Sequence, residues 1–253
     1  MNKPSSTRAK DRASALRDGD GNHIHNQILL AIPPNELERL LPKLEFVRLQ
    51  HHQVLHDAGE TLKSAYFCDS GMFSVLNLMP DGKSVEVGLV GKEGFSGLPL
   101  IAGFRTNHTR TIVQVAATAF RIEADRLKAA LRESPVLERQ IQRYAQIRAM
   151  QVVQLAACNR LHEVEERLAR WLLMSQDRLG SNILPLTQDF LAQMLGTRRS
   201  SVSVAAGILR RAGLINYSRG AATILDRPGL IEASCECYGQ LQRQTKEWES
   251  END

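Results

Sequence analysis

The sequence has few cysteines, no long apolar run and no recognisable export signal, and each absence excludes a class of protein. Four cysteines in 253 residues are too few and too scattered for a disulfide framework. No segment approaches the ~18 consecutive apolar residues that a membrane span needs. The N-terminal residues are polar and lack the apolar stretch of a secretory signal. We therefore expect a cytoplasmic protein with reduced thiols and no membrane partner.

Patterns that indicate catalysis or a cofactor are also missing. The sequence offers no Ser/His/Asp set, no paired carboxylates and no Walker-type phosphate loop, so we expect no catalytic residues and no enzyme. Cys235 and Cys237 form a lone C-x-C pair, with no second pair to complete a tetrahedral site. We therefore expect neither a metal nor any other cofactor. The alternative role for these two cysteines is a response to oxidation. Four histidines are haem-ligand candidates by residue type alone: His51, His52, His56 and His108.

Positive charge is concentrated in one part of the chain. The net charge is only +4. Residues 180–230 hold six arginines but only two acids, Asp189 and Asp226, so this segment carries an excess equal to that of the whole chain. A small basic domain is typical of proteins that bind the phosphate backbone of nucleic acid.

The sequence of the first half of the chain is typical of a β domain. Residues 1–24 are polar and aperiodic, which predicts a disordered tail, and residues 35–42 predict a short helix. From Leu44 to Glu123, turn residues separate short β-prone runs: EFVRL, QVLH, AYFCD, MFSVLNL, SVEVGLV, TRTIVQV and TAFRI. Asp81-Gly82 is typical of a hairpin turn. Short strands at this spacing predict an antiparallel barrel or jelly roll.

A long helix is predicted next, because Val136 to Cys158 contains no Gly or Pro. One stripe of this helix has spacings of three and four: Leu137, Ile141, Tyr144, Ile147, Gln151 and Leu155. Such a helix is either a strut between two domains or one half of a dimer seam. The motif that follows favours the seam, which would contain Ile141 and Tyr144.

The strongest signal is a helix-turn-helix over Leu186–Arg211, LTQDFLAQMLGTRRSSVSVAAGILRR. Thr187 is a good N-cap for a first helix, Gly196 makes the turn, and a second helix begins near Arg198. Ala192 and Val202 are small or apolar where the two helices cross. Polar and basic residues gather at the start of the second helix, the end that enters the major groove in a recognition helix.

A two-stranded wing is predicted after this motif, with Arg219 at its tip. The residues expected to contact DNA are Thr187, Gln188, Arg198, Arg199, Ser200, Ser201, Ser203, Val204 and Arg219.

Over residues 26–227 the chain resembles the cyclic-AMP receptor and fumarate-nitrate regulator (Crp/Fnr) family, in the helix-turn-helix, the wing and the runs QVLHDAGE, AYFCDSG and MPDGKSVEV. The resemblance implies an α+β fold whose segments are a cyclic-nucleotide-binding-like β jelly roll (25–134), a dimerisation helix (135–160), a winged helix-turn-helix (161–227) and a helical extension (228–253). It implies a homodimeric regulator that binds a palindromic operator on double-stranded DNA and has RNA polymerase as a further partner. The alternative is a ligand-responsive module acting through protein partners, which the basic, polar start of the second helix disfavours.

The resemblance also implies roles for single residues in the recognition helix. Arg199 stands at the leading base-reading arginine, Ser200 replaces the usual glutamate after it, and Val204 replaces a later arginine. The operator is therefore expected to differ from the family's best-known half-sites.

The effector pocket that the resemblance implies is degenerate. Its positions are Gly97, Leu98, Thr109, Arg110, Val152 and Val153. Leu98 replaces the glutamate that accepts from the ribose hydroxyl, and the phosphate-binding arginine falls at Thr109 or Arg110. The valines replace hydroxyls that would face the base. We therefore expect an unidentified effector other than cyclic AMP.

Overall fold

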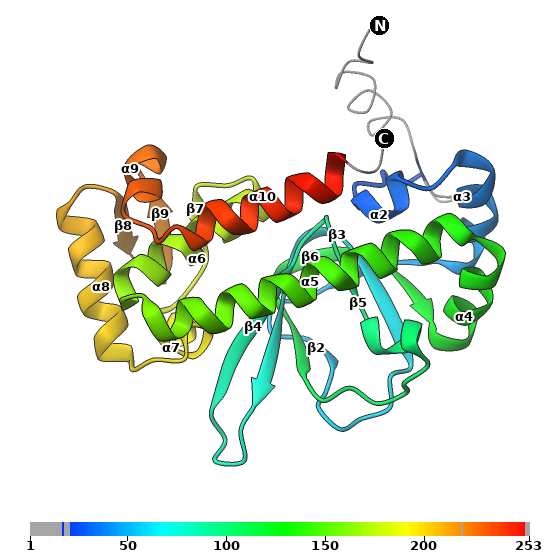
Figure 1. Ribbon diagram of the computed structural model, residues 1–253, viewed down its shortest axis with the longest axis horizontal. Coiled ribbons are helices and arrows are strands. Elements are labelled where there is room, and N and C mark those ends of the chain that lie inside the picture. The colour runs from blue at the N-terminus through cyan, green and yellow to red at the C-terminus, as the bar shows by residue number, and fades with distance from the viewer. Residues whose placement is uncertain (1–16, 18–20, 219, 251–253) are drawn as a thin grey trace, which may run out of the picture.

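In a computed structural model of the protein, a sheet domain and a helical DNA-binding-type domain are joined by one long helix (Figure 1). The structure describes residues 17, 21–218 and 220–250. Most of the predicted tail, residues 1–24, lies outside this part of the chain, but Ile24 is fully buried and the packed domain therefore includes it. Within the described residues, none of the helices combines the length and the hydropathy that a bilayer crossing requires.

The N-terminal sheet is antiparallel, with the strand order β1-β6-β3-β4, and with β2 paired to β6 and β5 paired to β3. Its strands are β1 (Glu45–Leu49), β2 (Val54–His56), β3 (Ser64–Leu78), β4 (Ser84–Val90), β5 (Phe95–Ser96) and β6 (Arg110–Glu123). This arrangement confirms the predicted antiparallel β domain. Its central strands β3 and β6 each unite two of the predicted β-prone runs, which had been expected as separate strands.

Gly71 explains why β3 continues through a predicted break. Its φ is +74°, and a Cβ there would collide with the backbone of Ala116 and Ala117 on β6. The β3–β6 register shifts on both sides of this region, so the glycine permits a bulge that bends the paired strands without ending them. The bent sheet encloses fully buried aromatic side chains: Phe67, Phe73, Phe95 and Phe120.

Short helices close the sheet domain. They are α2 (Gln27–Leu30), α3 (Pro34–Leu40), η1 (Leu41–Lys43), η2 (Leu98–Ala102) and α4 (Ala124–Glu133). Pro34 starts α3 because its missing N–H leaves no hydrogen bond unmade at the first helical position.

The long helix α5 (Pro135–Leu161) begins at Ser134, whose side chain accepts a hydrogen bond from the Leu137 amide. Its predicted apolar stripe packs against its own chain. Ile141 and Tyr144 are 0% and 2% exposed and belong to the sheet-domain core. The assignment of these two residues to a dimer seam is therefore wrong, because they are already covered by the sheet domain of the same chain.

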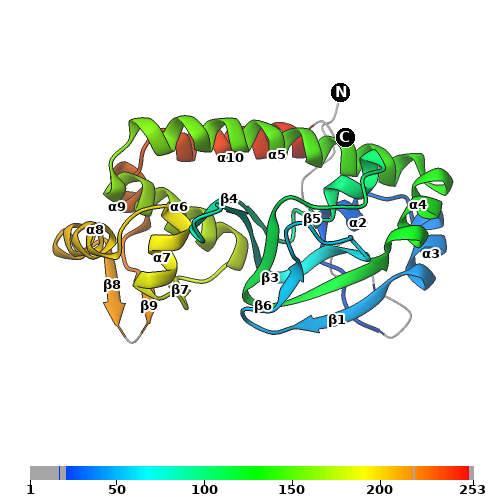
Figure 2. The ribbon, with the colours of Figure 1, turned by 90° about the horizontal axis from the view of Figure 1, so that it is seen from below.

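The C-terminal domain contains the predicted helix-turn-helix and wing. Its elements are α6 (Val164–Leu179), β7 (Ile183–Leu184), α7 (Gln188–Leu195), α8 (Arg199–Arg211), β8 (Ile215–Ser218), β9 (Ala221–Ile224), α9 (Arg227–Glu232) and α10 (Cys237–Ser250). The wing is a three-stranded sheet in the order β7-β9-β8, and its strand β7 was not predicted. The C-terminal extension, predicted as one helical pattern, divides into α9 and α10. The second of these lies alongside α5 in both views (Figures 1 and 2).

Candidate nucleic-acid interface

The helix-turn-helix forms as its sequence predicts. Thr187 caps α7 by accepting a hydrogen bond from the Phe190 amide at 3.2 Å. Gly196 ends α7 with φ +58°, a conformation that favours glycine and that turns the chain toward α8. Leu191 of α7 and Val202 of α8 are buried together in the core of the domain. The crossing of the two helices is thus fixed by small and apolar residues, and their polar residues remain outside.

The start of α8 is an exposed basic and polar surface. Arg198 is the N-cap residue, and Arg199 and Ser200 begin the helix, all three exposed to solvent. Figure 2 shows α8 at the end of the molecule that lies away from β1, with the wing strands β8 and β9 beside it. Amide N–H groups at a helix start favour anions, so this end of α8 is suited to a phosphate backbone.

Arg199 lies beside an acidic side chain of α7. Its Nε lies 3.4 Å from Oδ1 of Asp189 on α7, and both side chains are about two-thirds exposed. An exposed ion pair of this kind contributes ~0–1 kcal/mol, which a bidentate contact to a guanine can replace. Arg199 is therefore oriented by α7 and remains available to a base.

Two further predicted contact residues are joined by a hydrogen bond. The hydroxyl of Ser203 donates to Oε1 of Gln188 at 2.7 Å, which links the start of α7 to the outer face of α8. Val204 is 64% exposed on the same outer face, whereas Ser201 is half-buried. The structure thus brings the predicted residues of both helices onto one surface.

The wing lies next to this surface. Tyr217 on β8 donates its hydroxyl to the carbonyl oxygen of Leu186, just before α7, and this bond holds the wing against the helix-turn-helix. Gly220 adopts φ +76° in the turn between β8 and β9. The predicted contact residue Arg219 lies outside the described residues.

The structure places the predicted effector positions on several elements of the sheet domain and on α5. Gly97 packs against Ala65, which pairs with Ile122 near the end of β6, whereas Arg110 is the first residue of that strand. Leu98 packs on the apolar core beside α5, and Thr109 lies in the loop before β6. Val152 and Val153 are exposed on α5. That these positions surround one ligand therefore stays a prediction.

Arg110 already has an anionic partner. Its Nε and Nη2 donate to the two carboxylate oxygens of Asp57 at 2.8 and 3.0 Å. This bidentate pair holds the pKa of Asp57 below its ordinary value. A phosphate that bound the same fork of the guanidinium would have to displace Asp57.

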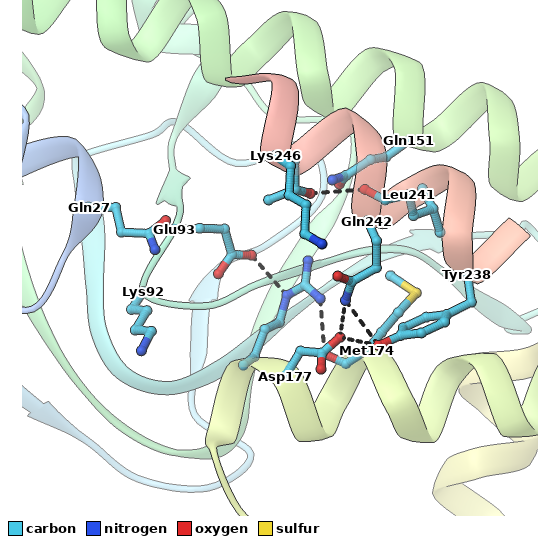
Figure 3. Close-up of a pocket in the computed structure, with 12 residues that line it drawn as sticks. Gln27, Lys92, Glu93, Gln151, Met174, Asp177, Tyr238, Leu241, Gln242 and Lys246 are labelled. Carbon is cyan, nitrogen blue, oxygen red and sulfur yellow. Dashed lines mark hydrogen bonds and ion pairs between the residues drawn. The ribbon is translucent and has the colours of Figure 1, made fainter. Parts of the chain in front are cut away.

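A cavity of about 280 Å³ lies between α10, α6 and the loop before β5 (Figure 3). Arg178 donates to Glu93 at 2.8 Å across it, and Asp177 accepts from the hydroxyl of Tyr238 at 2.9 Å. Polar and apolar side chains both line the cavity, and these charged groups are paired within the chain. Sequence reasoning missed it because residues from distant segments form its walls.

A buried carboxylate connects the two domains. Glu86 on β4 accepts hydrogen bonds from Nε1 of Trp171 on α6, at 2.8 Å, and from the hydroxyl of Ser74, at 2.6 Å. Burial raises the pKa of Glu86, and both bonds oppose that rise. Trp171 therefore joins the C-terminal domain to the sheet domain.

A second cluster that the sequence did not reveal lies where α5 ends. The thiols of Cys158, Cys235 and Cys237 are buried together with the half-buried ring of His162. The Sγ atoms of Cys158 and Cys235 lie 3.5 Å apart. Their hydrogen bond lowers the pKa of Cys158 to about 5 and raises that of Cys235. The C-x-C pair alone gave no sign that Cys158 and His162 would join it.

Two family models match the chain. One is a cyclic nucleotide-binding domain, over residues 46–134, and the other is a Crp-like helix-turn-helix domain, over residues 166–233. Together they cover more than half of the chain. No curated protein matches it significantly in sequence.

Several solved structures share the fold. FixK2 from Bradyrhizobium japonicum has a TM-score of 0.66 at 14% identity, covering 76% of this chain and 98% of its own. A CRP-family transcriptional regulator from Thermus thermophilus has a TM-score of 0.63 at 22% identity, covering 76% of this chain and 99% of its own. A CRP/FNR-family regulator from the same organism has a TM-score of 0.64 at 20% identity, and the match covers 75% of this chain and 98% of that regulator. The likeness extends over nearly the whole length of each of these proteins.

Proposed function

Because the chain belongs to the Crp/Fnr family of DNA-binding transcription regulators, we propose that it acts in the cytoplasm as a homodimer that binds a palindromic operator on double-stranded DNA. The observation that carries this proposal is the exposed start of α8, where Arg198 and Arg199 precede polar residues and no acid lies on the helix. Burying such a surface in a protein core would be costly, whereas the major groove offers it phosphates and base edges. The protein acts by binding, and we assign it no catalytic residue.

We assign the predicted contact residues separate roles in this complex. Arg199 reads a guanine through O6 and N7, because bidentate arginine–guanine pairing is the commonest specific contact. Ser200, Ser203 and Gln188 donate or accept at neighbouring base edges. Thr187, Ser201, Arg198 and Arg219 contact the backbone, and Val204 offers an apolar surface to a thymine methyl group.

The dimer seam that we propose is the outer face of α5. Exposed residues recur there at alternating spacings of four and three: Gln142, Gln146, Ala149, Val153, Ala156 and Arg160. This is the heptad period of a two-stranded coiled coil, and its central members are small or apolar. Val153 is 71% exposed in the single chain, and a second copy packed along this face would bury it.

A two-fold dimer of this kind places its two recognition helices in successive major grooves. The half-sites should then lie about one helical turn apart, ~34–36 Å. We propose RNA polymerase as a further partner and leave the effector unidentified, since Leu98, Val152 and Val153 are apolar at positions where a nucleotide would need hydrogen-bond partners.

The experiment that tests this function is selection of bound fragments from random double-stranded DNA. The expected result is a palindrome with half-sites one turn apart. Arg199→Ala should weaken binding to it by ~1–3 kcal/mol and relax the preference at one base pair in each half-site. The exposed Arg132, on α4 in the sheet domain, provides the control, and Arg132→Ala should leave affinity and preference unchanged. Selection of no common sequence, or an unchanged base preference in Arg199→Ala, would contradict the proposal.

A further inference from the structure

Four metal-ligating side chains meet where α5 ends and the C-terminal extension returns to it. They are Cys158 in the last turns of α5, His162 at its C-cap, Cys235 between α9 and α10, and Cys237 at the first position of α10. One ligand atom from each of the four lies within 4.8 Å of all the others. The three thiols are at most 3% exposed. Segments about 75 residues apart in the chain therefore present one shared set of soft ligands.

All four ligand atoms lie within 4.8 Å of one another, and two of the distances between them match those around one tetrahedral ion. Sγ of Cys158 lies 3.5 Å from Sγ of Cys235, and Sγ of Cys237 lies 3.6 Å from Nδ1 of His162. Zinc bonds of about 2.3 Å to sulfur and 2.0–2.1 Å to nitrogen, at tetrahedral angles, place neighbouring ligand atoms roughly 3.5–3.8 Å apart. We propose that Cys158, His162, Cys235 and Cys237 bind one structural Zn²⁺ ion.

The histidine is oriented as a zinc ligand requires. Its Nδ1 faces the thiols, and its Nε2 lies 3.1 Å from a carboxylate oxygen of Glu236. A metal-bound histidine almost always donates its other N–H to a carboxylate, a carbonyl or water, and this bond fixes the ring and its tautomer. Nε2 of Gln154 also donates to Sγ of Cys237 at 3.0 Å, a bond that favours a thiolate. Both neighbours therefore hold ligands in place.

The buried positive charges near these four residues also favour a bound zinc ion. Three thiolates and one Zn²⁺ carry a net charge of −1. Arg167 and Arg170 are buried on α6 within electrostatic range of Cys158, and neither forms an ion pair with a carboxylate in the described part of the chain. Glu86 acts on Arg170 only at longer range. Because buried cations require compensation, an anionic zinc site would add a close counter-charge for two arginines on which Glu163 and Glu86 act without forming ion pairs.

The arrangement favours a single ion over the other fates of clustered thiols. A two-iron cluster inserts a second metal atom between ligand pairs and needs those pairs further apart than the ligands of one ion. A disulfide between Cys158 and Cys235 would use two of the ligands and leave Cys237 and His162 without a role. Structural zinc sites have four protein ligands, which leave no coordination position open, and thiolates are common among them. The three thiols and one histidine of this cluster match that pattern.

The ion would fasten the extension at the junction of the two domains. Cys158 and His162 lie at the end of α5, immediately before α6 carries the chain into the DNA-binding domain. Cys235 and Cys237 lie where α10 begins, and this helix runs back along α5 (Figure 1). The site therefore fixes the direction in which α6 leaves α5. Metal loss should release α10 and loosen the position of α8 relative to the sheet domain.

Metal analysis of the untagged full chain, purified under reducing conditions, tests the site without reference to DNA. The expected result is about one zinc per chain. Cys158→Ser and Cys235→Ser should retain less than about a tenth of that zinc. The matched control is Cys68→Ala, because Cys68 is a buried thiol of β3 remote from the cluster, and it should keep the full content.

Two further measurements keep the test independent of protein folding. Titration of the zinc-free, reduced wild-type chain with Co²⁺ should give the visible absorption of a tetrahedral thiolate site at one equivalent. Glu236→Gln should weaken zinc binding by about 10–100-fold, whereas the exposed Glu232→Gln should leave it unchanged. The proposal is overturned by a reduced chain that binds neither Zn²⁺ nor Co²⁺, by an iron–sulfur chromophore, or by equal zinc loss in Cys68→Ala.

Discussion

His56 is a buried histidine on β2 that must remain neutral in the folded protein. It is 6% exposed, its ring packs 5.5 Å from that of Tyr66, and its Nε2 has no hydrogen-bond partner within the described structure. Burial lowers its pKa from 6.5 to about 4. Because the charged form would be desolvated, the ring acts as an apolar filler of the sheet.

This histidine should make stability depend on pH. Above pH 6.5 both folded and unfolded states hold it neutral. As pH falls toward 4 the unfolded chain binds a proton that the folded chain refuses, so stability decreases. The loss is about 1.4 kcal/mol per pH unit inside this window, or roughly 2 kcal/mol between pH 7 and pH 5.

Urea unfolding at several pH values measures the effect. His56→Gln should lose that part of the pH dependence, and the exposed His108→Gln should keep it. Parallel pH profiles for wild type and His56→Gln would show that His56 titrates normally and is not held neutral.

At the scale of a single element, α5 has one face buried against the sheet domain and one face exposed. Its buried face, which includes Ile141 and Tyr144, completes the core of the sheet domain. Its exposed face carries the heptad positions of the proposed seam, centred on Ala149 and Val153. A substitution should therefore have a different consequence on each face.

Val153→Glu should convert the dimer to a monomer while leaving the chain folded. Two glutamates facing each other across a coiled-coil seam repel, and they replace an apolar contact. Light scattering measures the assembly, and circular dichroism checks the fold. Val54→Glu, the same change at a 48% exposed site on β2, should remain dimeric.

Ile141→Glu provides the opposite outcome on the other face. It buries a charge in the sheet-domain core and should destabilise the fold itself. A Val153→Glu protein that remained dimeric would move the interface away from α5.

At the scale of the whole molecule, the sheet domain touches the DNA-binding domain directly as well as through α5. Glu86 bonds to Trp171 of α6, and Ser84 on β4 accepts from the side-chain amide of Gln193 on α7. A ligand could change DNA binding through these contacts only if it bound one arrangement of the domains more tightly than the other.

Cyclic AMP should not act in this way. Leu98 cannot accept from a ribose hydroxyl, and the guanidinium of Arg110 is occupied by Asp57. Losing several polar contacts at ~1–1.5 kcal/mol each, and more for the charged one, weakens a micromolar site toward millimolar. We therefore expect operator affinity to change less than about twofold with cyclic AMP.

Calorimetry combined with an operator-binding assay checks both parts of this expectation. Asp57→Asn weakens the competing pair and should increase whatever affinity the phosphate has for Arg110. A micromolar Kd for wild type, with a tenfold or larger gain in operator affinity, would contradict the expectation and identify Arg110 as a phosphate ligand.

Local signals in the sequence determined the elements of this protein and its DNA-binding surface. The cap at Thr187, the glycine at 196 and the apolar spacing of the two helices predicted the helix-turn-helix, because each depends on neighbours within a few residues. The antiparallel sheet followed from its short runs and turns in the same way. The sequence alone identified the residues at the start of α8 as exposed, because they are polar and lie outside the apolar face of the helix.

Only the tertiary structure decided what depends on contacts between distant segments. The apolar stripe of α5 predicted a buried face but not its partner, since the sheet of the same chain and a second chain cover apolar residues equally well. The cluster of Cys158, His162, Cys235 and Cys237 arises only when α10 returns along α5, and no local spacing records that return. Likewise, Asp57 and Arg110 pair through the packing of β2 against β6. Sequence periodicity sets which residues are apolar or charged, whereas chain topology sets which of them meet.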